Sequence, residues 1–208
     1  MSITAVSERV FDCLRRMDCE ATTIVKGAPT GLNWYGGYAG NRQTEPQWSR
    51  RLVELLRADG LDAKRECRYP GLPRARCDVV IDLGAGETLW LEIKGAWKEY
   101  WRQQGNEWIY RSYLLHPLVA GLDKTKTHTA PLDLKKLETL TRRDAAYVGM
   151  LLVGFDSDTA PMDADVAELV RLAGLEMQPW TTVSTGWPDP HRPGCRVRCW
   201  LWHRAVTE

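Results

Sequence analysis

The sequence contains no long apolar run. No stretch of its 208 residues approaches the roughly 18 apolar residues that identify a membrane-spanning helix. The N-terminus also lacks the basic-then-apolar layout of a signal peptide, and its pattern instead predicts an amphipathic helix. The six cysteines form no CxxC pair, so we interpret them as reduced thiols that serve as small apolar side chains. We therefore expect a cytoplasmic protein that does not contact a membrane.

Charge of one sign is equally scarce, because the formal net charge is only +1. Such a balance does not by itself indicate binding to nucleic acid or to a membrane surface. Hydrophobic residues make up 44% of the chain and charged residues 26%, which is typical of a globular protein. We expect a single domain over residues 1–208, with its core at about 44–155. An N-terminal helix and loop (1–43) would precede this core, and a C-terminal extension (156–208) would follow it.

Helical and strand patterns both recur along the chain. Apolar residues at helical spacing, together with capping signals, predict helices at 4–19, 44–60, 132–141 and 163–173. Alternating or continuous apolar runs predict strands at 63–69, 76–83, 88–95, 146–155, 181–185 and 195–206. This mixture indicates the α/β or α+β class. We expect an α/β fold with a central mixed sheet flanked by helices, and with an extra C-terminal helix and strand or hairpin.

Asp78 and Glu92 are predicted to face each other across a β-hairpin. A loop at 84–86 centres the hairpin on Ala85, so each acid lies seven residues from the centre. Facing side chains on antiparallel strands have Cβ atoms about 4.5–5.5 Å apart. Two carboxylates at that separation repel each other, and a divalent cation bound between them would compensate. Oxygen ligands favour Mg²⁺, with Mn²⁺ as a substitute.

Lys94 lies two residues beyond Glu92 and therefore on the same face of the strand. Its ammonium could orient the water that attacks a phosphate and stabilise the charge that develops. The backbone carbonyl of Ile93, between these two residues, is a further candidate metal ligand. The alternative is an exposed strand with alternating polar residues, in which Lys94 merely neutralises the two acids.

The segment from Asp78 to Lys94, in which DVVID is followed by a turn and then LWLEIK, resembles the core motif of the PD-(D/E)xK nuclease superfamily. The order of one helix, three strands, one helix and one strand over about 44–155 is also similar to the restriction-endonuclease-like fold of that superfamily. The resemblance implies Mg²⁺-dependent hydrolysis of phosphodiester bonds, with Asp78 and Glu92 as metal ligands and Lys94 as a catalytic residue. One departure is Cys77, which stands where the motif has proline.

Many members of this superfamily carry a further acid on the helix before the strands, and here that helix offers Glu45 and Glu54. At about 100° per residue, Glu45 falls within the apolar stripe of Trp48 and Leu52, whereas Glu54 falls on the opposite side. We therefore predict that Glu45 is the fourth catalytic residue and that Glu54 faces solvent. Glu45 could instead only favour the helix dipole. Asp82 is a reserve candidate on the face of Asp78.

Basic residues after the motif are candidates for contacting nucleic acid. Some are interleaved with aromatic residues that could stack bases, and the others form a second basic group. These candidates are Lys98, Arg102, Lys124, Lys126 and Lys136. An outward helix face explains Lys136 and its neighbour Lys135 equally well.

The C-terminal strand shows an alternation that could present an arginine and tryptophan face to a nucleic acid or a protein partner. That face consists of Arg196, Arg198, Trp200, Trp202 and Arg204. The opposite face includes Cys195, Cys199 and His203, but these three span too long a stretch of strand to meet at one zinc ion.

We thus expect a metal-dependent endonuclease that cuts DNA, with prokaryotic restriction, phage defence and repair as compatible settings. The chain would act as a homodimer or as a subunit of a larger nuclease or defence complex. Two alternatives remain open from the sequence. One is a catalytically silent module on the same fold that binds nucleic acid or protein, and the other is a ribonuclease.

Overall fold

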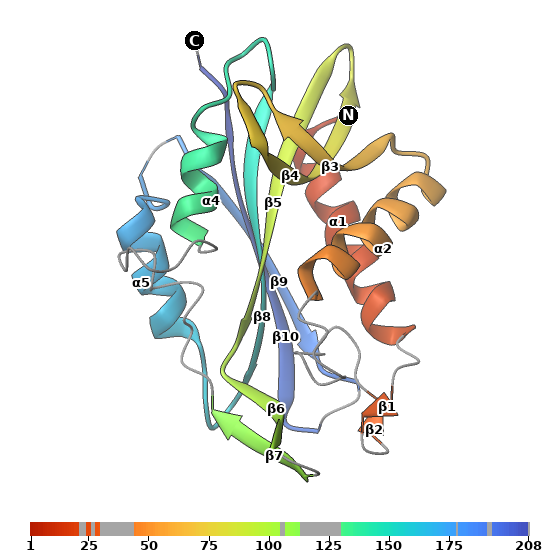
Figure 1. The fold of residues 1–208 in the computed structure, drawn as a ribbon, viewed down its shortest axis with the longest axis vertical. Helices are drawn as coiled ribbons and strands as arrows, with labels where there is room; N and C mark the ends of the chain where they lie inside the picture. The colour runs from red at the N-terminus through yellow and green to blue at the C-terminus, as the bar shows by residue number, and fades with distance from the viewer. Residues whose placement is uncertain are drawn as a thin grey trace.

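The computed structural model in Figure 1 describes residues 1–20, 24–25, 28–29, 44–104, 107–112, 130–177, 179–190 and 193–207. For residues 24–25, 28–29, 44–45, 99–104 and 107–112 only the backbone is described.

Six strands form one central sheet in the order β3-β4-β5-β8-β10-β9. The strands are β3 (Ala63–Tyr69), β4 (Leu72–Gly84), β5 (Glu87–Trp97), β8 (Tyr147–Ser157), β9 (Thr181–Pro188) and β10 (Cys195–Ala205). Neighbouring strands run antiparallel except β5 and β8, which run parallel. The α/β class and the mixed sheet are thereby confirmed, and the two C-terminal strands belong to the same sheet as the hairpin.

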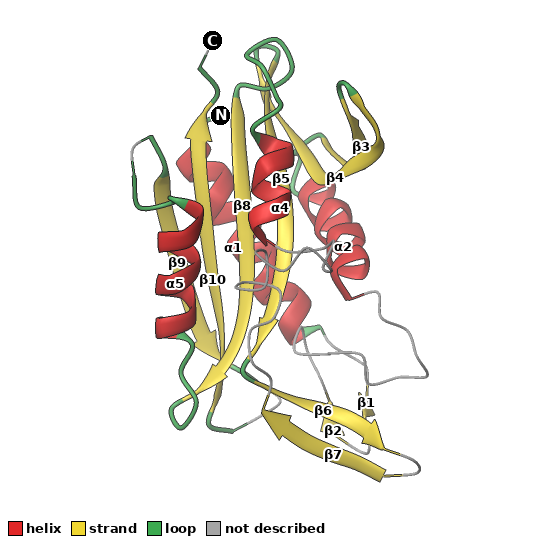
Figure 2. Cartoon of the chain, turned by 60° about the vertical axis from the view of Figure 1, so that its left-hand side comes forward, coloured by secondary structure: helices red, strands yellow, loops and turns green. Residues whose placement is uncertain are grey.

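Helices cover both faces of this sheet. Helices α1 (Ile3–Cys19) and α2 (Thr44–Ala58) lie on one face, whereas α4 (Ala130–Leu137) and α5 (Asp163–Ala173) lie on the other (Figures 1 and 2). Each face has its own apolar cluster, because successive residues of the strands point to opposite sides. Val79 and Leu91 pack beneath α1 and α2, whereas Val80 and Trp90 pack beneath α4 and α5.

Several helix ends differ from the sequence prediction: α2 stops at Ala58 and not at residue 60, and α4 begins at Ala130 and not at residue 132. Helix α4 stops at Leu137 and not at residue 141, because the chain then forms turns in which the amide of Thr139 donates to the carbonyl of Lys136 and the amide of Leu140 to that of Leu137. The N-cap of α5 is Met162, next to the predicted start of the helix at residue 163, and it makes no side-chain cap hydrogen bond. The amide of Met162 donates instead to Asp156 at 3.1 Å, so a buried carboxylate from β8 performs the capping role.

The predicted alternation of β10 is confirmed, but its tryptophans do not form an open binding face. Trp200 and Trp202 belong to the apolar cluster under α4 and α5, and Trp202 is only 1% exposed. Val197 and Cys199 lie in the opposite cluster. The β10 tryptophans therefore fill the core, because β10 is paired on both edges and covered by helices.

Two short pairs of strands lie outside the main sheet. Strand β1 (Ile24–Val25) pairs with β2 (Ala28–Pro29), and β6 (Glu99–Gln104) pairs with β7 (Glu107–Ser112), both antiparallel. The second pair forms a hairpin at the end of β5 (Figure 2). Over the residues that the structure describes, none of the helices combines the length and the apolar composition needed to span a bilayer.

Candidate active site

The register of the β4–β5 hairpin is the one that the sequence predicts. Val79 pairs with Leu91 and Val80 with Trp90, and continuing this register places Asp78 opposite Glu92. The turn itself differs from the prediction, because Gly84 pairs with Glu87 and leaves a two-residue loop in place of the predicted three. Ala85 and Gly86 both have positive φ, 55° and 79°, as two-residue hairpin turns of type I′ require. A register shift after Asp82 absorbs the extra residue.

Strands β4 and β5 separate where the two acids lie. The last backbone pair between these strands is Val79–Leu91. Beyond it the amide of Ile93 donates to a carboxylate oxygen of Asp78, at 2.8 Å. Because the N–H and C=O of one strand residue point to the same side, the carbonyl of Ile93 also faces the gap beside Asp78. The candidate site is this gap between diverging strands, on the side of α4.

Glu92 lies at the bottom of the site and is only 2% exposed. The hydroxyl of Tyr69 donates to its Oε1 at 2.6 Å, and the ammonium of Lys136 lies 3.4 Å from the same oxygen. The pKa of Glu92 is raised well above its ordinary value, first by burial and then by the negative charges of Asp78 and Asp133. A buried carboxyl with two acidic neighbours favours a bound proton or a bound cation.

Asp78 is half-buried and closes the site on the β4 side. Burial raises its pKa, and hydrogen bonds from the amide of Ile93 and from Glu92 oppose that rise. The positive charge of Lys94 also lowers the pKa of Asp78. Asp78, Glu92 and Lys94 therefore act on one another electrostatically, as their shared strand face predicts.

Helix α4 contributes the second half of the site. The ammonium of Lys94 lies 2.8 Å from Oδ2 of Asp133, and the ammonium of Lys136 lies 2.5 Å from Oδ1 of the same carboxylate. Oδ2 of Asp133 is buried and accepts no hydrogen bond of good geometry, so its contact with Lys94 is an ion pair only. Among the described side chains, three carboxylates and two ammonium groups thus meet between β4, β5 and α4.

The site contains two side chains that sequence reasoning did not select, Asp133 and Tyr69. Asp133 shares the buried stripe of α4 with Ala130, Leu134 and Leu137. An acid within an apolar stripe at helical spacing was a usable signal, since such residues are seldom buried without a partner. Tyr69 lies at the end of β3 and packs against Trp90, with ring centroids 5.4 Å apart. Nothing in the sequence pattern distinguishes it from an ordinary core tyrosine.

Cys77, the residue in the place of the motif's proline, does not follow the predicted strand alternation. Strict alternation along β4 would place it on the face of Val79, but it packs in the opposite cluster, with Tyr69. Its thiol donates to the carbonyls of Val79 and Leu91, both at 3.4 Å. The irregularity coincides with Glu66 on the neighbouring strand, whose φ of 56° interrupts the β3–β4 ladder. Burial and the nearby carboxylates raise the pKa of this thiol well above its usual range.

The phase predicted for α2 is confirmed for its described side chains. Trp48 and Leu52 are buried, whereas Glu54 faces solvent and pairs with Arg51 at 3.0 Å. The side chain of Glu45 lies outside the described residues, so its place in the site stays a prediction. Asp82 is not part of the site, because it is exposed and accepts from the amide of Gly84 at 2.7 Å within the turn.

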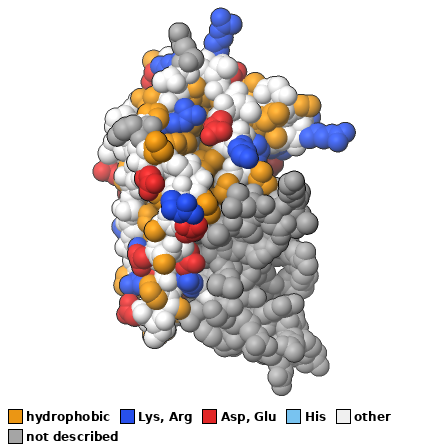
Figure 3. All heavy atoms as spheres, turned by 90° about the vertical axis from the view of Figure 1, so that its left-hand side faces the viewer, with side chains coloured by type: hydrophobic (Ala, Val, Ile, Leu, Met, Phe, Trp, Pro, Cys, Tyr) orange, Lys and Arg blue, Asp and Glu red, His pale blue; other side chains and the backbone are white. Residues whose placement is uncertain are grey.

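The basic residues predicted to contact nucleic acid lie in different surroundings. Lys136 points into the site and not outward, whereas its neighbour Lys135 is exposed. Lys98 pairs with Asp165 of α5 at 2.5 Å. Arg102, Lys124 and Lys126 lie outside the residues whose side chains are described. On the described part of the face that carries α4 and α5, acidic and basic side chains are interspersed and form no continuous basic patch (Figure 3).

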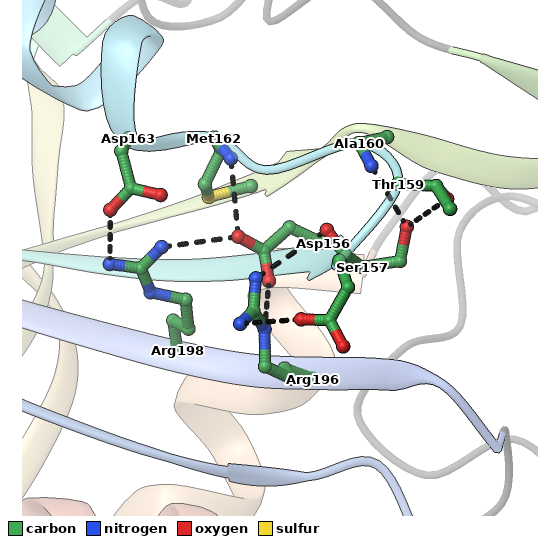
Figure 4. Close-up of polar contacts among 9 residues, drawn as sticks. Asp156, Ser157, Thr159, Ala160, Met162, Asp163, Arg196 and Arg198 are labelled. Carbon is green, nitrogen blue, oxygen red and sulfur yellow. Dashed lines mark hydrogen bonds and ion pairs between the residues drawn. The ribbon is translucent and has the colours of Figure 1, made fainter.

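Asp156 is another buried carboxylate of this fold, and its surroundings can be compared with those of Glu92. It is 2% exposed and lies between Arg196 and Arg198, at 3.0 and 3.2 Å (Figure 4). With the amide of Met162 it has three donors. Both arginines come from β10, so Asp156 joins the end of β8 to that strand and to the start of α5. Glu92 differs because the charges of Asp78 and Asp133 raise its pKa, and because its described cationic contact, Lys136, is shared with Asp133.

The donor set at the diverging strands fits Mg²⁺. Among the described side chains, no group of three or more His, Cys, Asp or Glu residues is arranged to hold a metal ion. Mg²⁺ nevertheless uses one or two protein carboxylates, with waters and substrate phosphates completing its octahedron. Asp78 and Glu92 supply such a pair, and the carbonyl of Ile93 faces the same gap.

Comparison with known proteins places the chain in no family. No family model matches the sequence, and the searches of curated proteins and of solved structures found no match. What the fold and the site define is an α/β protein with a buried cluster of carboxylates and lysines where two strands diverge.

Proposed function

We propose that this protein is a metal-dependent nuclease, with Asp78, Glu92 and Lys94 as the core of its active site. The observation that carries the proposal is the Asp78–Glu92 pair. Two interacting carboxyls lie side by side at the point where β4 and β5 separate, and the pKa of each is raised. Such perturbed acids in one place mark a candidate functional site. Their resemblance to the PD-(D/E)xK motif specifies the chemistry.

Asp78 and Glu92 would hold Mg²⁺, with the Ile93 carbonyl as a further ligand. When bound, the ion supplies a polarised water and stabilises negative charge on a phosphate. Tyr69 fixes the orientation of Glu92 through its 2.6 Å hydrogen bond. Asp133 holds the ammonium of Lys94 in the site, where its charge would stabilise the negative charge that develops on the scissile phosphate. Glu45 is proposed as the fourth acidic residue, from the first turn of α2.

We propose DNA as the substrate, in keeping with the resemblance of the Asp78, Glu92 and Lys94 motif to the restriction-endonuclease-like fold. The proposed setting is cytoplasmic, in restriction, phage defence or repair, with the chain acting as a homodimer or within a larger complex. Lys98, Arg102, Lys124 and Lys126 remain proposed contacts to the nucleic acid. RNA is the alternative substrate, and the assay described below includes it.

One observation favours a second candidate, a catalytically silent binding module on this fold. Lys94 and Lys136 already pair with Asp133 and Glu92, so the cluster is partly neutralised without a metal ion. Among the described side chains, three carboxylates still face two ammonium groups. The excess negative charge is why we prefer the metal-dependent function.

The deciding experiment is a cleavage assay with plasmid, linear duplex DNA, single-stranded DNA and RNA, each in Mg²⁺, Mn²⁺ or EDTA. Glu92→Ala and Lys94→Ala should abolish metal-dependent cutting. Glu54→Ala is the matched control, since Glu54 is an exposed acid paired with Arg51. Equal cutting by wild type and both site variants would exclude the mechanism, and no cutting under any condition would favour the binding module.

A further inference from the structure

Lys136 of α4 extends into the candidate site, so it is not an ordinary surface lysine. Its ammonium lies between Oε1 of Glu92, at 3.4 Å, and Oδ1 of Asp133, at 2.5 Å. Lys136 therefore bridges a strand residue and a helix residue. Its side chain is 30% exposed, whereas that of Lys94 is 7% exposed. Of the two ammonium groups in the cluster, Lys136 is the one that solvent, and hence a substrate, can reach.

The same ammonium is in conflict with a metal ion bound by Glu92. A divalent cation held by Asp78 and Glu92 would bring a second positive charge close to Lys136, and like charges at short range repel. The described ion pair of Lys94 is with Asp133, at 2.8 Å, and does not involve Glu92. The flexible four-carbon stem of a lysine lets its ammonium move while the helix stays in place. Lys136 can therefore leave Glu92 and remain paired with Asp133.

We propose that Lys136 stands in for the cation in the metal-free site and, once metal is bound, becomes the residue that binds the substrate phosphate. This inference rests on the proposed nuclease function and names the phosphate-binding residue of that site. It has a thermodynamic consequence. Metal alone must displace an ammonium from Glu92, whereas metal together with a phosphodiester gives the displaced ammonium a new anionic partner. Metal and phosphodiester should therefore bind with positive coupling.

The first measurement is Mn²⁺ binding in the absence of nucleic acid, followed by the electron paramagnetic resonance signal of free Mn²⁺. Lys136→Gln and Lys136→Met should each bind Mn²⁺ about tenfold more tightly than wild type, the effect of removing one competing charge. Lys135→Gln is the matched control, because it removes the same charge from the adjacent, exposed position of α4. Its affinity should equal that of wild type. Glutamine at 136 keeps a donor for Asp133, which protects the fold, and thermal melting checks it.

The second measurement repeats the Mn²⁺ titration with dimethyl phosphate, the smallest phosphodiester. This compound should increase the Mn²⁺ affinity of wild type and of Lys135→Gln. The increase should be at least several-fold smaller for Lys136→Gln. Equal coupling in all three proteins would overturn the assignment of Lys136 to the phosphate. Unchanged or weaker Mn²⁺ affinity in both Lys136 variants would overturn its role as a stand-in cation.

Failure of this inference is distinguishable from failure of the proposed function. If wild type binds Mn²⁺ and Glu92→Gln does not, the metal site stands, and only the Lys136 results decide the inference. If none of the proteins binds Mn²⁺, the nuclease proposal and this inference are both overturned.

Discussion

The ammonium of Lys94 and the carboxylate of Asp133 form an ion pair of 2.8 Å in which both side chains are almost completely buried. The pair connects the middle of β5 to α4, and Asp133 is shared with the ammonium of Lys136 at 2.5 Å. Removing one member of such a pair leaves an uncompensated buried charge, which is more costly than removing both.

A double-mutant cycle should therefore show strong coupling between these two residues. Asp133→Leu and Lys94→Met should each destabilise the fold by about 2–4 kcal/mol. The double variant should lose less than the sum, with a coupling free energy of about 1–3 kcal/mol. Urea unfolding of the four proteins provides the free energies. Additive losses would show that the charges are compensated elsewhere in the cluster.

Replacing Glu92 by Gln should stabilise the metal-free protein at neutral pH. The pKa of Glu92 is raised above its ordinary value of 4.5, so its carboxyl contributes stability below that pH. This contribution is lost as the pH rises through the folded-state pKa. The melting temperature of wild type should fall relative to Glu92→Gln as the pH rises above about 5, by about 2–4 °C per kcal/mol for a chain of this size.

Added metal should reverse the order of the two melting temperatures. Mg²⁺ or Mn²⁺ at neutral pH should raise the melting temperature of wild type and leave Glu92→Gln unchanged, since a ligand stabilises only the state that binds it. A metal-induced rise of equal size in both proteins would show that the ion binds elsewhere.

The hydroxyl of Tyr69 should contribute both to the stability of the fold and to metal binding. Tyr69→Phe removes a 2.6 Å hydrogen bond to buried Glu92, and hydrogen bonds to charged groups contribute about 1.5–3 kcal/mol. We expect a loss of stability in that range, together with weaker Mn²⁺ binding, because Glu92 is no longer oriented. Tyr147→Phe, at the start of β8 and away from the cluster, is the control. Normal metal binding by Tyr69→Phe would restrict Tyr69 to a packing role.

Asp156 should contribute to the stability of the fold but not to the affinity for metal. Asp156→Ala leaves Arg196 and Arg198 without their shared carboxylate and removes the cap of the Met162 amide (Figure 4). We expect destabilisation of about 2–3 kcal/mol. Mn²⁺ affinity should be unchanged below the unfolding transition. A change in that affinity would mean that this cluster and the site are coupled.

Glu45 and Glu54 offer a paired test of helical phase in cleavage assays. Glu45→Ala should lower the rate of metal-dependent cutting by tenfold or more, an effect of about 1.4 kcal/mol or larger on the barrier. Glu54→Ala should leave the rate within about twofold of wild type, because Glu54 is an exposed acid. The reverse ranking would contradict the orientation assigned to the first turn of α2.

The sequence predicted those parts of the site that depend on local geometry. Alternation along β4 and β5, together with the glycines of the turn, was sufficient to place Asp78 opposite Glu92 and Lys94 on the same face. The turn was assigned one residue too many, but a bulge compensated and the register survived. Helical phase likewise placed Glu54 in solvent.

The parts that failed depend on contacts between distant elements. Asp133 enters the site only because α4 packs over β5, and the pattern of one helix cannot specify which strand it covers. Cys77 lies on the other side at the place where Glu66, a residue with positive φ, stands on the neighbouring strand. Met162 caps α5 because Asp156 approaches from β8. In each case the determining partner is remote in sequence.

The parallel pairing of β5 with β8 gives the site an order of assembly. Parallel neighbours cannot be joined by a tight turn, and the connection that returns the chain from the end of β5 to the start of β8 contains α4. Glu92 and Lys94 are thus at one end of this connection, and Asp133 and Lys136 lie within it. During folding the hairpin acids can meet early, through local contacts, but their counter-charges arrive only when the connection closes. A nascent chain that ends before α4 carries the acids without the lysine and aspartate of that helix, so the complete charge cluster exists only in the folded domain.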